Sequence, residues 1–209
     1  MPYILGLTGN IACGKTSVGL MLLELGAAAY VDADQTVHEL YLPGQPLVAR
    51  IAAALGPDVV GADGGIDRKL LGDRVFRDPA AMRQLEAIVH PAVQSALVGR
   101  MRELPDEGVG VLDAVKLVES GYAPFCQGIW VVRCTEATQL RRLEVQRGLS
   151  PNDARARLAA QPAMAPKLAV ATAIIDNDGS LDQLRARVTE EWTRFRATIG
   201  HTGDHTGGQ

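Results

Sequence analysis

Residues 9–16 read GNIACGKT and match the phosphate-binding pattern GxxxxGK[ST] in full. The motif directly follows an apolar run at 3–8 and precedes an amphipathic helical pattern that starts at Lys15. In such a strand–loop–helix unit, backbone N–H groups and the helix N-terminus bind phosphate oxygens. The alternative interpretation, a glycine-rich turn that binds no ligand, would also have to explain why a strand precedes the motif and a helix follows it. The motif therefore predicts an α/β fold that binds a nucleoside triphosphate at this loop.

The residues of this loop divide into phosphate ligands and a metal ligand. Lys15 is expected to reach the β- and γ-phosphates, and the Thr16 hydroxyl to bind Mg²⁺. Cys13 lies at the N-terminus of the predicted helix, a position that lowers a thiol pKa, so one hypothesis is that Cys13 is oxidisable. The need for a small residue at this position explains the presence of cysteine equally well. The residues predicted to bind ATP here are Gly9, Asn10, Ile11, Ala12, Cys13, Gly14, Lys15, Thr16 and Ser17.

Composition narrows the class of protein. Ala, Leu and Val supply most of the 47% hydrophobic content and aromatic residues only 4%, which favours helices packed on a parallel sheet over a β-sandwich. The net charge of −3 argues against a general binder of nucleic acid or of anionic membranes. The sequence also lacks an apolar run of about 18 residues, which a membrane span needs.

The sequence predicts a cytoplasmic protein. Met1 and Pro2 lead directly into the first predicted strand, so no signal peptide is expected. The three cysteines, Cys13, Cys126 and Cys134, are odd in number and lack metal-ligand spacing, which suits a reducing compartment.

Strand and helix patterns alternate along the chain, as βαβ units require. The predicted strands are residues 3–8, 28–32, 109–113, 128–134 and 172–176. The predicted helices are residues 15–25, 34–41, 46–55, 67–76, 79–90, 135–147 and 180–199, with one more that begins at residue 150. Pro91 is expected to break or kink the helix from Pro79, which then resumes to about residue 104.

Residues 57–66 and 162–166 are expected to be irregular. Residues 200–209 are polar and glycine-rich, so they are predicted to form a disordered tail. Its histidines, His201 and His205, are interpreted as exposed residues rather than metal ligands.

Three aspartates follow predicted strands. In open α/β sheets, ligands bind at the carboxyl ends of the strands, where the phosphate loop and Asp32 must both lie. If the chain is still extended beyond Asp32, Asp34 points to the same side, and the two carboxylates can address a metal-bound phosphate and an acceptor hydroxyl. Alternatively, both cap the following helix. Asp113 ends a strand and either supports Mg²⁺ through water or caps the next loop.

The segment 133–157 contains six arginines against three acids, in a protein that is acidic overall. This pattern predicts an anion-attracting lid, because guanidinium groups suit phosphate oxygens. Arg147, next to Gly148, is the first candidate to close on ATP, and Arg142 is the second. The alternative is a solvated helix face in which Glu144 pairs with arginines on the same helix.

The chain resembles the dephospho-CoA kinase family along nearly all of residues 3–196. The likeness rests on short motifs in a specific order and spacing. These are LTGNIACGKTSV at 7–18, VDAD at 31–34, DR at 67–68, VFRDP at 75–79, LEAIVHP at 85–91, QRG at 146–148, AAQ at 159–161 and IDNDG at 175–179.

The resemblance implies transfer of the γ-phosphoryl group of ATP to the ribose 3′-hydroxyl of 3′-dephospho-CoA, giving CoA and ADP. It implies that Asp34 accepts or orients the hydroxyl proton and that Asp32 is its companion on the metal side. The predicted catalytic residues are Asp34, Lys15 and Arg147, with Arg142 and Arg147 also binding ATP. The predicted acceptor ligands are Asp32, Asp34, Arg77 and His90, and the predicted metal ligands are Thr16, Asp32 and Asp113.

The expected fold is a five-stranded parallel sheet P-loop NTPase of the nucleoside-monophosphate-kinase type. We expect one kinase domain at 1–200 and a tail at 201–209. Its predicted parts are a core at 1–34, 105–135 and 168–200, a helical acceptor-binding insertion at 35–104 and a helical lid at 136–167.

His90 has an equal alternative as a core or helix-capping histidine. The expected partners are ATP, Mg²⁺ and 3′-dephospho-CoA, without nucleic acid or membrane, for a monomer or weak homo-oligomer.

Three positions depart from the family pattern. Residues 115–119 read VKLVE where relatives show a Pro-Leu-Leu-aromatic-Glu run, and Lys116 either contacts an acceptor phosphate or points to solvent. Thr172 replaces a common aspartate, and Asn10 replaces a common glycine. The remaining alternatives are another small-molecule P-loop kinase, or a nucleotide-binding protein that does not catalyse transfer, either a switch or an inactive homologue. A GTPase-like switch is disfavoured because the sequence lacks an NKxD segment.

Overall fold

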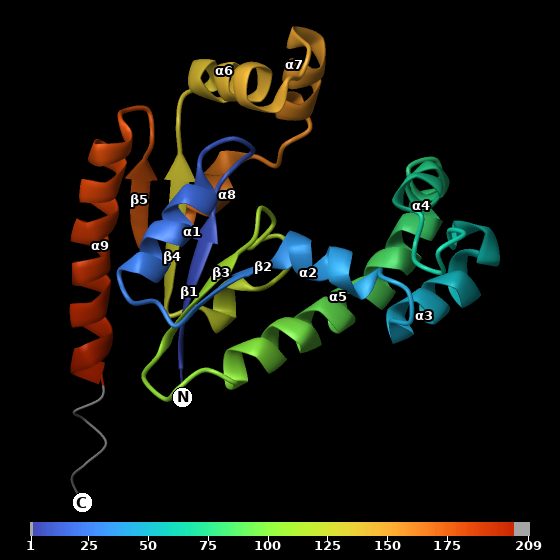
Figure 1. Cartoon of the computed structure of the whole chain (residues 1–209), viewed down its shortest axis with the longest axis horizontal. Helices are drawn as coiled ribbons and strands as arrows, with labels where there is room; N and C mark the ends of the chain where they lie inside the picture. The colour runs from blue at the N-terminus through green and yellow to red at the C-terminus, as the bar shows by residue number, and fades with distance from the viewer. Residues whose placement is uncertain (1, 203–209) are drawn as a thin grey trace, which may run out of the picture. The chain divides into compact units, whose positions relative to one another are not determined.

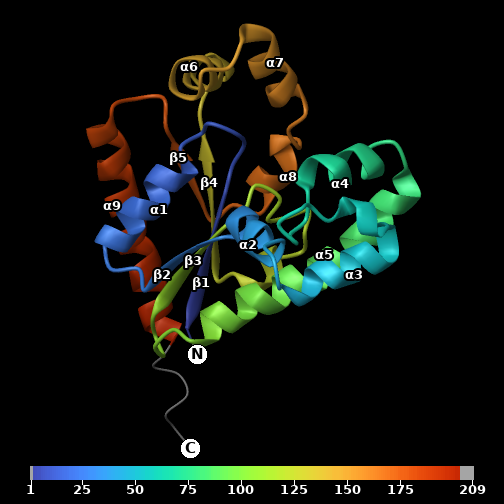
Figure 2. The same cartoon turned by 45° about the vertical axis from the view of Figure 1, so that its right-hand side comes forward.

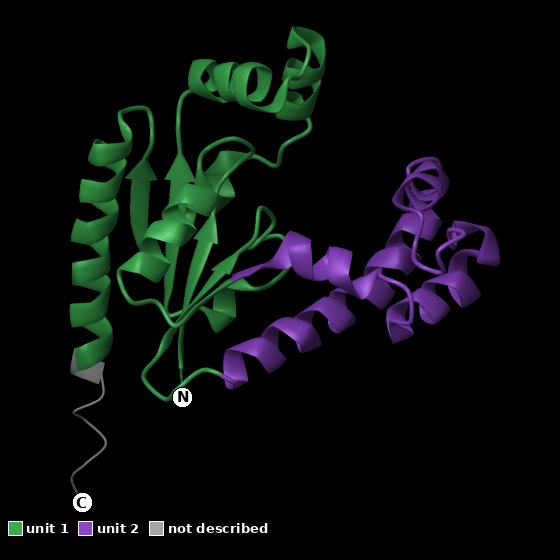
Figure 3. Ribbon diagram, in the orientation of Figure 1, with its two compact units in different colours: residues 1–30, 104–209 green, residues 31–103 purple. Residues whose placement is uncertain are grey.

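The computed structural model describes residues 2–202. The chain separates into two compact units, coloured separately in Figure 3. Residues 1–30 and 104–209 belong to the first unit, and residues 31–103 belong to the second. The boundary at residue 31 lies within a strand, a few residues before the predicted insertion at 35–104. The acceptor-binding role of that segment stays a prediction.

A five-stranded sheet forms the centre of the first unit, with the strand order β2-β3-β1-β4-β5 (Figure 1). The strands are β1 (Tyr3–Thr8), β2 (Ala29–Asp32), β3 (Val109–Asp113), β4 (Gly128–Arg133) and β5 (Ala173–Asp176). β1 pairs in parallel with β3 and β4, and β4 with β5. The predicted five-stranded parallel sheet of a P-loop kinase is confirmed.

Helices cover this sheet and extend beyond its carboxyl edge. They are α1 (Lys15–Glu24), α6 (Glu136–Arg147), α7 (Pro151–Ala159), α8 (Met164–Ala169) and α9 (Leu181–Thr202). Figures 1 and 2 show α1 and α9 side by side on one face, with α6 and α7 beyond the end of β4. α9 runs three residues past its predicted end at Ile199. Residues 203–209, including His205, lie outside the described residues, as does the side chain of His201.

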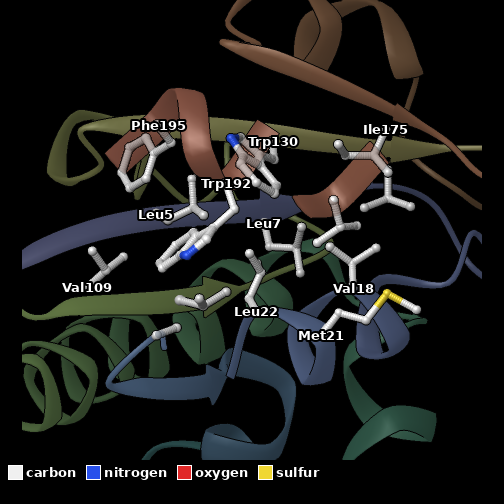
Figure 4. Close-up of a cluster of buried hydrophobic side chains, with 14 of the residues drawn as sticks. Leu5, Leu7, Val18, Met21, Leu22, Val109, Trp130, Ile175, Trp192 and Phe195 are labelled. Carbon is white, nitrogen blue, oxygen red and sulfur yellow. The ribbon is translucent and has the colours of Figure 1, made fainter. Parts of the chain in front are cut away.

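The main core lies between the sheet and the pair α1–α9. Leu5 and Leu7 alternate along β1, so both point to this face, where they meet Leu22 of α1 (Figure 4). From α9, Phe195 packs edge-on against Trp130 of β4, with ring centroids 6.5 Å apart. These side chains are buried, and the core therefore holds the strand before the phosphate loop and the helix after it in one rigid unit.

The opposite face of β1 is covered by the chain that follows β3. A Cβ at Gly6 would lie 2.9 Å from the side chains of both Leu117 and Cys126. This covering segment includes a short 3₁₀ turn at Ala123–Phe125. Burial here raises the pKa of the Cys126 thiol to about 12.

Thr172, one of the departures from the family pattern, has a structural role. Its hydroxyl accepts a hydrogen bond from Ile129 N at 2.9 Å and lies 3.1 Å from Ile129 O, which ties the start of β5 to β4. Lys116 is exposed, and its contact with an acceptor phosphate stays a prediction.

Lys167 of α8 is a fully buried cation, with a side chain that is 0% exposed. Its Nζ donates to the Glu119 carboxylate at 2.5 Å, and the Glu119 side chain is 33% exposed. Burial is the largest single effect and raises the pKa of Glu119, but the hydrogen bond from Lys167, a backbone hydrogen bond and the charges of Lys167 and Lys116 together outweigh it, so the pKa is lowered overall. The ion pair anchors α8 to the segment that covers β1.

Glu119→Gln is expected to destabilise the protein by roughly 3 kcal/mol at neutral pH, because it leaves a buried ammonium without its counter-charge. Lys167→Met replaces that ammonium with an apolar side chain of similar volume and should cost less. Because the folded state lowers the Glu119 pKa, the stabilisation is present at neutral pH and is lost as pH falls through that lowered pKa. Urea unfolding of both variants measures the difference, and equal losses would contradict it.

The second unit is helical. Its elements are α2 (Ala33–Leu40), α3 (Pro46–Leu55), the 3₁₀ helix η1 (Pro57–Val59), α4 (Arg68–Val75) and α5 (Pro79–Arg102). Asp67 and Asp78 cap α4 and α5: Asp67 accepts from Lys69 N and Leu70 N, and Asp78 accepts from Ala80 N. Within the region predicted to be irregular, Val60 and Ile66 form a single β-bridge.

Of the two alternatives predicted at Pro91, a break is wrong, because α5 continues through it, and a kink stays a prediction. Proline lacks the N–H that would bond the carbonyl four residues earlier, so one helical hydrogen bond is missing. Val89, Val93, Leu97 and Met101, spaced four residues apart, form one buried stripe along α5. Burial of this stripe outweighs the local cost of the proline.

The prediction that residues 162–166 are irregular is also partly wrong. α8 begins at Met164 and contains Pro166 in its first turn. The N–H groups of a first turn have no helical acceptor, so proline is tolerated there. Among residues 2–202, no helix combines the length and apolar character needed to cross a membrane.

Candidate nucleotide site

A pocket of about 390 Å³ lies in the first unit, where the chain leaves the carboxyl end of β1. Its walls come from the phosphate loop, from α6 and from the turn that joins β5 to α9. The lining residues are Ala12, Gly14, Lys15, Thr16, Ser17, Arg142, Gln146, Arg147, Asn177, Gly179, Leu181 and Leu184. Many of the residues predicted to bind ATP therefore surround one cavity, whose size suits a small ligand.

The phosphate loop needs two of its glycines for separate reasons. Gly9 has φ +148, and a Cβ there would lie 2.1 Å from the Val132 carbonyl oxygen. Gly14 has φ +95, and a Cβ there would lie 2.2 Å from Asn177 Nδ2. Ala12 also has positive φ, at 58°, a conformation that disfavours any side chain. Glycine thus permits both the backbone turn and the close approach of neighbouring elements.

Lys15 is the first residue of α1, and its Nζ lies 4.0 Å from Asp113 Oδ1. The side chains are 13% and 5% exposed, so water screens their attraction poorly. Tyr30 donates a hydrogen bond to Asp113 Oδ2 at 2.6 Å. Asp113 therefore orients the lysine at the pocket wall. The role of Tyr30 was not predicted from the sequence, because it depends on tertiary packing against Gly19 of α1. A Cβ at Gly19 would lie only 2.1 Å from the Tyr30 ring.

Arg142 lines the pocket and also binds its walls together. Its Nη1 donates to Ala12 O at 3.1 Å and its Nη2 to Asn177 O at 2.8 Å. Asn177 and Gly179 were not assigned to the site from sequence, although they belong to the IDNDG motif on which the family resemblance partly rests. Leu181, exposed and apolar, lines the same cavity and carries no sequence signal of its own.

Arg147 ends α6 and is exposed, and Gly148 terminates the helix in the left-handed conformation. The lid segment also contacts the phosphate loop: Gln161 Oε1 accepts from Ile11 N at 2.9 Å, and Asn10 Nδ2 donates to Pro162 O at 3.3 Å. Asparagine at position 10, where the family usually has glycine, thus links loop and lid.

Asp32 and Asp34 do not share the predicted extended conformation. Asp32 is extended and caps α2, with Oδ1 accepting from Asp34 N at 2.8 Å and from Gln35 N at 3.1 Å. Asp34 already lies in the first helical turn and is exposed. The capping interpretation therefore holds for Asp32, and the expectation that both point to one side of a strand is wrong. Helix α2 starts directly after Asp32 because its carboxylate satisfies the first N–H groups.

The other two predicted acceptor ligands also belong to the second unit. Arg77 lies between α4 and α5 and is exposed. His90 lies in the middle of α5 and is exposed too, which removes both alternatives for it, a core histidine and a helix cap. Their role in acceptor binding stays a prediction.

The residues of the first unit fit Mg²⁺ bound chiefly through substrate phosphates. Thr16 is exposed and lines the pocket, and the buried Asp113 carboxylate lies beside Lys15. Among residues 2–202, no group of three or more His, Cys, Asp or Glu side chains forms a dedicated metal cage. Mg²⁺ in phosphoryl-transfer sites needs no such cage, because phosphates and water supply most ligands.

Cys13, within the phosphate loop, is a buried thiol with a lowered pKa of about 7. The hydrogen bond from the Cys134 thiol is the main cause; burial opposes the shift, and the charge of Lys15 assists it. The same hydrogen bond, together with burial, raises the pKa of Cys134. Near neutral pH, Cys13 is therefore the thiol of this pair that ionises.

The thiolate of Cys13 is expected to weaken ATP binding roughly fivefold as pH rises through about 7, because it places a negative charge beside the phosphates. Thiolate absorbance at 240 nm should show a transition near the same pH. Cys13→Ser should remove the absorbance transition and the associated pH dependence. A transition that persists in Cys13→Ser would refute the assignment.

A family model described as dephospho-CoA kinase matches residues 3–183. A dephospho-CoA kinase from Symbiobacterium thermophilum is 47% identical over 202 residues, which cover 96% of this chain and 83% of that protein. One from Geobacter sulfurreducens is 42% identical over 193 residues, covering 91% and 98% respectively.

A solved structure agrees with these sequence matches. The dephospho-CoA kinase from Campylobacter jejuni superimposes with a TM-score of 0.70 at 25% identity, covering 95% of this chain and all of that one. The matches extend across the phosphate loop, the helical unit at 31–103 and the lid. The chain belongs to the dephospho-CoA kinase family of ATP-dependent kinases.

Proposed function

We propose that the protein transfers the γ-phosphoryl group of ATP to the ribose 3′-hydroxyl of 3′-dephospho-CoA, giving CoA and ADP. The observation that carries the proposal is the family match over residues 3–183, which includes both units and the pocket at the phosphate loop. Phosphoryl transfer of this kind depends on positioning and charge stabilisation more than on covalent chemistry by the protein.

ATP occupies the pocket of the first unit. The β- and γ-phosphates bind the loop N–H groups and Lys15, which neutralises charge that develops in the transition state. The adenosine part lies between the Arg142 guanidinium and Leu181, which both line the cavity. Arg147 at the end of α6 adds a second guanidinium to the phosphates from the lid side.

Asp34 acts on the acceptor. The 3′-hydroxyl oxygen attacks the γ-phosphorus while the bond to the β–γ bridging oxygen breaks, and the hydroxyl proton passes to the Asp34 carboxylate. An exposed carboxylate suits this role because it can accept the proton late in the transfer. Asp32 supports α2 and lies on the metal side, and Arg77 and His90 bind anionic groups of the acceptor.

In this proposal Thr16 and Asp113 would hold Mg²⁺, the hydroxyl directly and the carboxylate through water, and Asp32 would be a further oxygen ligand. When bound, Mg²⁺ neutralises charge on the β- and γ-phosphates. The protein works in the cytoplasm as a monomer or weak homo-oligomer, without nucleic acid or membrane as a partner. Its free cysteines, Cys13, Cys126 and Cys134, suit that reducing compartment.

A coupled assay of ADP production tests this proposal. The protein is incubated with Mg-ATP and either 3′-dephospho-CoA, a panel of nucleosides and nucleotides, or no acceptor, and CoA is identified by mass spectrometry. We expect turnover with 3′-dephospho-CoA at least a hundredfold above the other conditions. Equal ADP production in all conditions would defeat the proposal, and turnover with a nucleoside alone would indicate the alternative small-molecule kinase.

A further inference from the structure

Three consecutive carbonyl groups of the phosphate loop accept hydrogen bonds from side chains outside it. Gln139 Nε2 donates to Ile11 O at 2.8 Å, Arg142 Nη1 to Ala12 O at 3.1 Å, and Asn177 Nδ2 to Cys13 O at 2.8 Å. We call Gln139, Arg142 and Asn177 the carbonyl bracket. Gln139 does not line the pocket, and its Nε2 also lies 3.4 Å from Cys13 Sγ.

Burial makes the bracket a rigid one. Gln139 is 7% exposed and Asn177 is 6% exposed, so neither amide can exchange its partner for bulk water without cost. The two amides come from different elements, α6 and the turn after β5. Arg142 joins these elements, because its second nitrogen donates to the backbone carbonyl of Asn177 at 2.8 Å. The loop is thus held from two directions by one connected network.

The direction of a carbonyl determines the direction of the next N–H group. In a trans peptide unit the C=O and the following N–H point to opposite sides, and the described residues contain no cis peptide bond. Holding the carbonyls of Ile11 and Cys13 on the outer side therefore turns the N–H groups of Ala12 and Gly14 to the inner side. Ala12 and Gly14 both line the pocket. The Cys13 N–H faces Asn10 O across the turn, at 3.4 Å.

We propose that Gln139 and Asn177 are positioning residues for phosphate binding, which hold the loop carbonyls outward so that the intervening N–H groups point at the phosphates. This inference rests on the proposed nucleotide site but not on the identity of the acceptor. Oriented N–H donors bind an anion without reorganisation when it arrives. Loss of the Gln139 or Asn177 donor should therefore weaken phosphate binding without removing any of the N–H groups that bind phosphate.

The test uses Gln139→Glu and Asn177→Asp, which keep side-chain shape but replace the N–H donor with an oxygen that repels the carbonyl. Binding of ADP, inorganic tripolyphosphate and adenosine is measured by calorimetry or ligand-observed NMR. We expect each variant to bind ADP and tripolyphosphate about tenfold more weakly, with adenosine affinity changed less than twofold. The ³¹P resonance of the bound β-phosphate should shift, because its N–H donors have turned.

Gln127→Glu is the matched control. It makes the same chemical change in a side chain that accepts a hydrogen bond from Ile4 N, near the start of β1 and therefore at the opposite end of that strand from the phosphate loop. Gln139→Met, which removes the donor without adding charge, covers the case in which a charged variant does not fold, and about threefold weaker tripolyphosphate binding is expected.

Three results would overturn the inference: wild-type protein that does not bind tripolyphosphate, bracket variants that bind it as well as Gln127→Glu does, or equal losses for adenosine and tripolyphosphate. The proposed function fails separately, if 3′-dephospho-CoA is not phosphorylated by wild-type protein. Because the binding measurements contain no acceptor, their outcome does not depend on that assay.

Discussion

Asp34→Asn is expected to lower kcat about a thousandfold with 3′-dephospho-CoA as acceptor, while ATP affinity stays within about twofold. The carboxamide has nearly the shape of the carboxylate but cannot take the hydroxyl proton. Asp34 is an exposed residue in the first turn of α2, so the loss of its charge should cost the helix at most about 1 kcal/mol. Single-turnover kinetics with saturating Mg-ATP measures the transfer step directly.

Two other aspartate substitutions separate chemistry from helix stability. Asp73→Asn removes an exposed carboxylate from α4 of the same unit and should leave turnover near that of the wild type. Asp32→Asn retains the cap of α2, because asparagine accepts from the same N–H groups, so any loss of turnover reports the charge of Asp32. If Asp34→Asn kept more than a tenth of wild-type kcat, Asp34 would not be the proton acceptor.

Lys15→Met is expected to lower kcat by about a hundredfold to a thousandfold and to weaken ATP binding as well. The ammonium is the principal cation of the phosphate loop, and methionine keeps the length of the side chain but not its charge. The substitution also removes the positive charge beside the buried Asp113 carboxylate, which accepts a hydrogen bond from the Tyr30 hydroxyl. Steady-state kinetics and ATP calorimetry on the same preparation give both effects.

Lys15→Arg tests whether charge alone is sufficient. A guanidinium is planar and wider than an ammonium, and the Lys15 side chain is only 13% exposed, so the variant should recover ATP affinity better than kcat. Thermal melts without ligand show whether either variant has lost stability. Turnover of Lys15→Met within tenfold of the wild type would remove Lys15 from the catalytic residues.

Local signals in the sequence predicted the starts of helices well. Helices were expected to begin at or next to four polar residues, and each of these side chains accepts a hydrogen bond from the first turn of its helix. They are Asp67, Asp78, Thr135 and Ser150. Capping involves atoms only two or three residues apart, so the residue type and its neighbours determine it. The continuous apolar strands were equally clear, because both faces of the sheet are covered.

The two main errors have different causes. Pro91 disfavours a helix locally, yet the buried stripe from Val89 to Met101 keeps α5 continuous. Asp32 and Asp34 were expected on one side of an extended chain, but the Asp32 cap starts α2 between them. Packing along α5 therefore overrides the local preference at Pro91. At Asp32, by contrast, a local cap decided the conformation, and capping was the alternative that the sequence had left open.

The sequence by itself determined the phosphate loop, the parallel α/β class and the kinase family, because each is encoded in short motifs or in hydrophobic period. The lid role of the arginine-rich segment stays a prediction. Only the tertiary structure decided what holds that loop in shape. Tyr30 and Asp113 orient Lys15, and Gln139 and Asn177 bind the carbonyls of Ile11 and Cys13. These partners are separated by more than 80 residues from the loop or from one another. Their hydrogen bonds form only when the sheet brings their elements together, so a local sequence pattern cannot predict them.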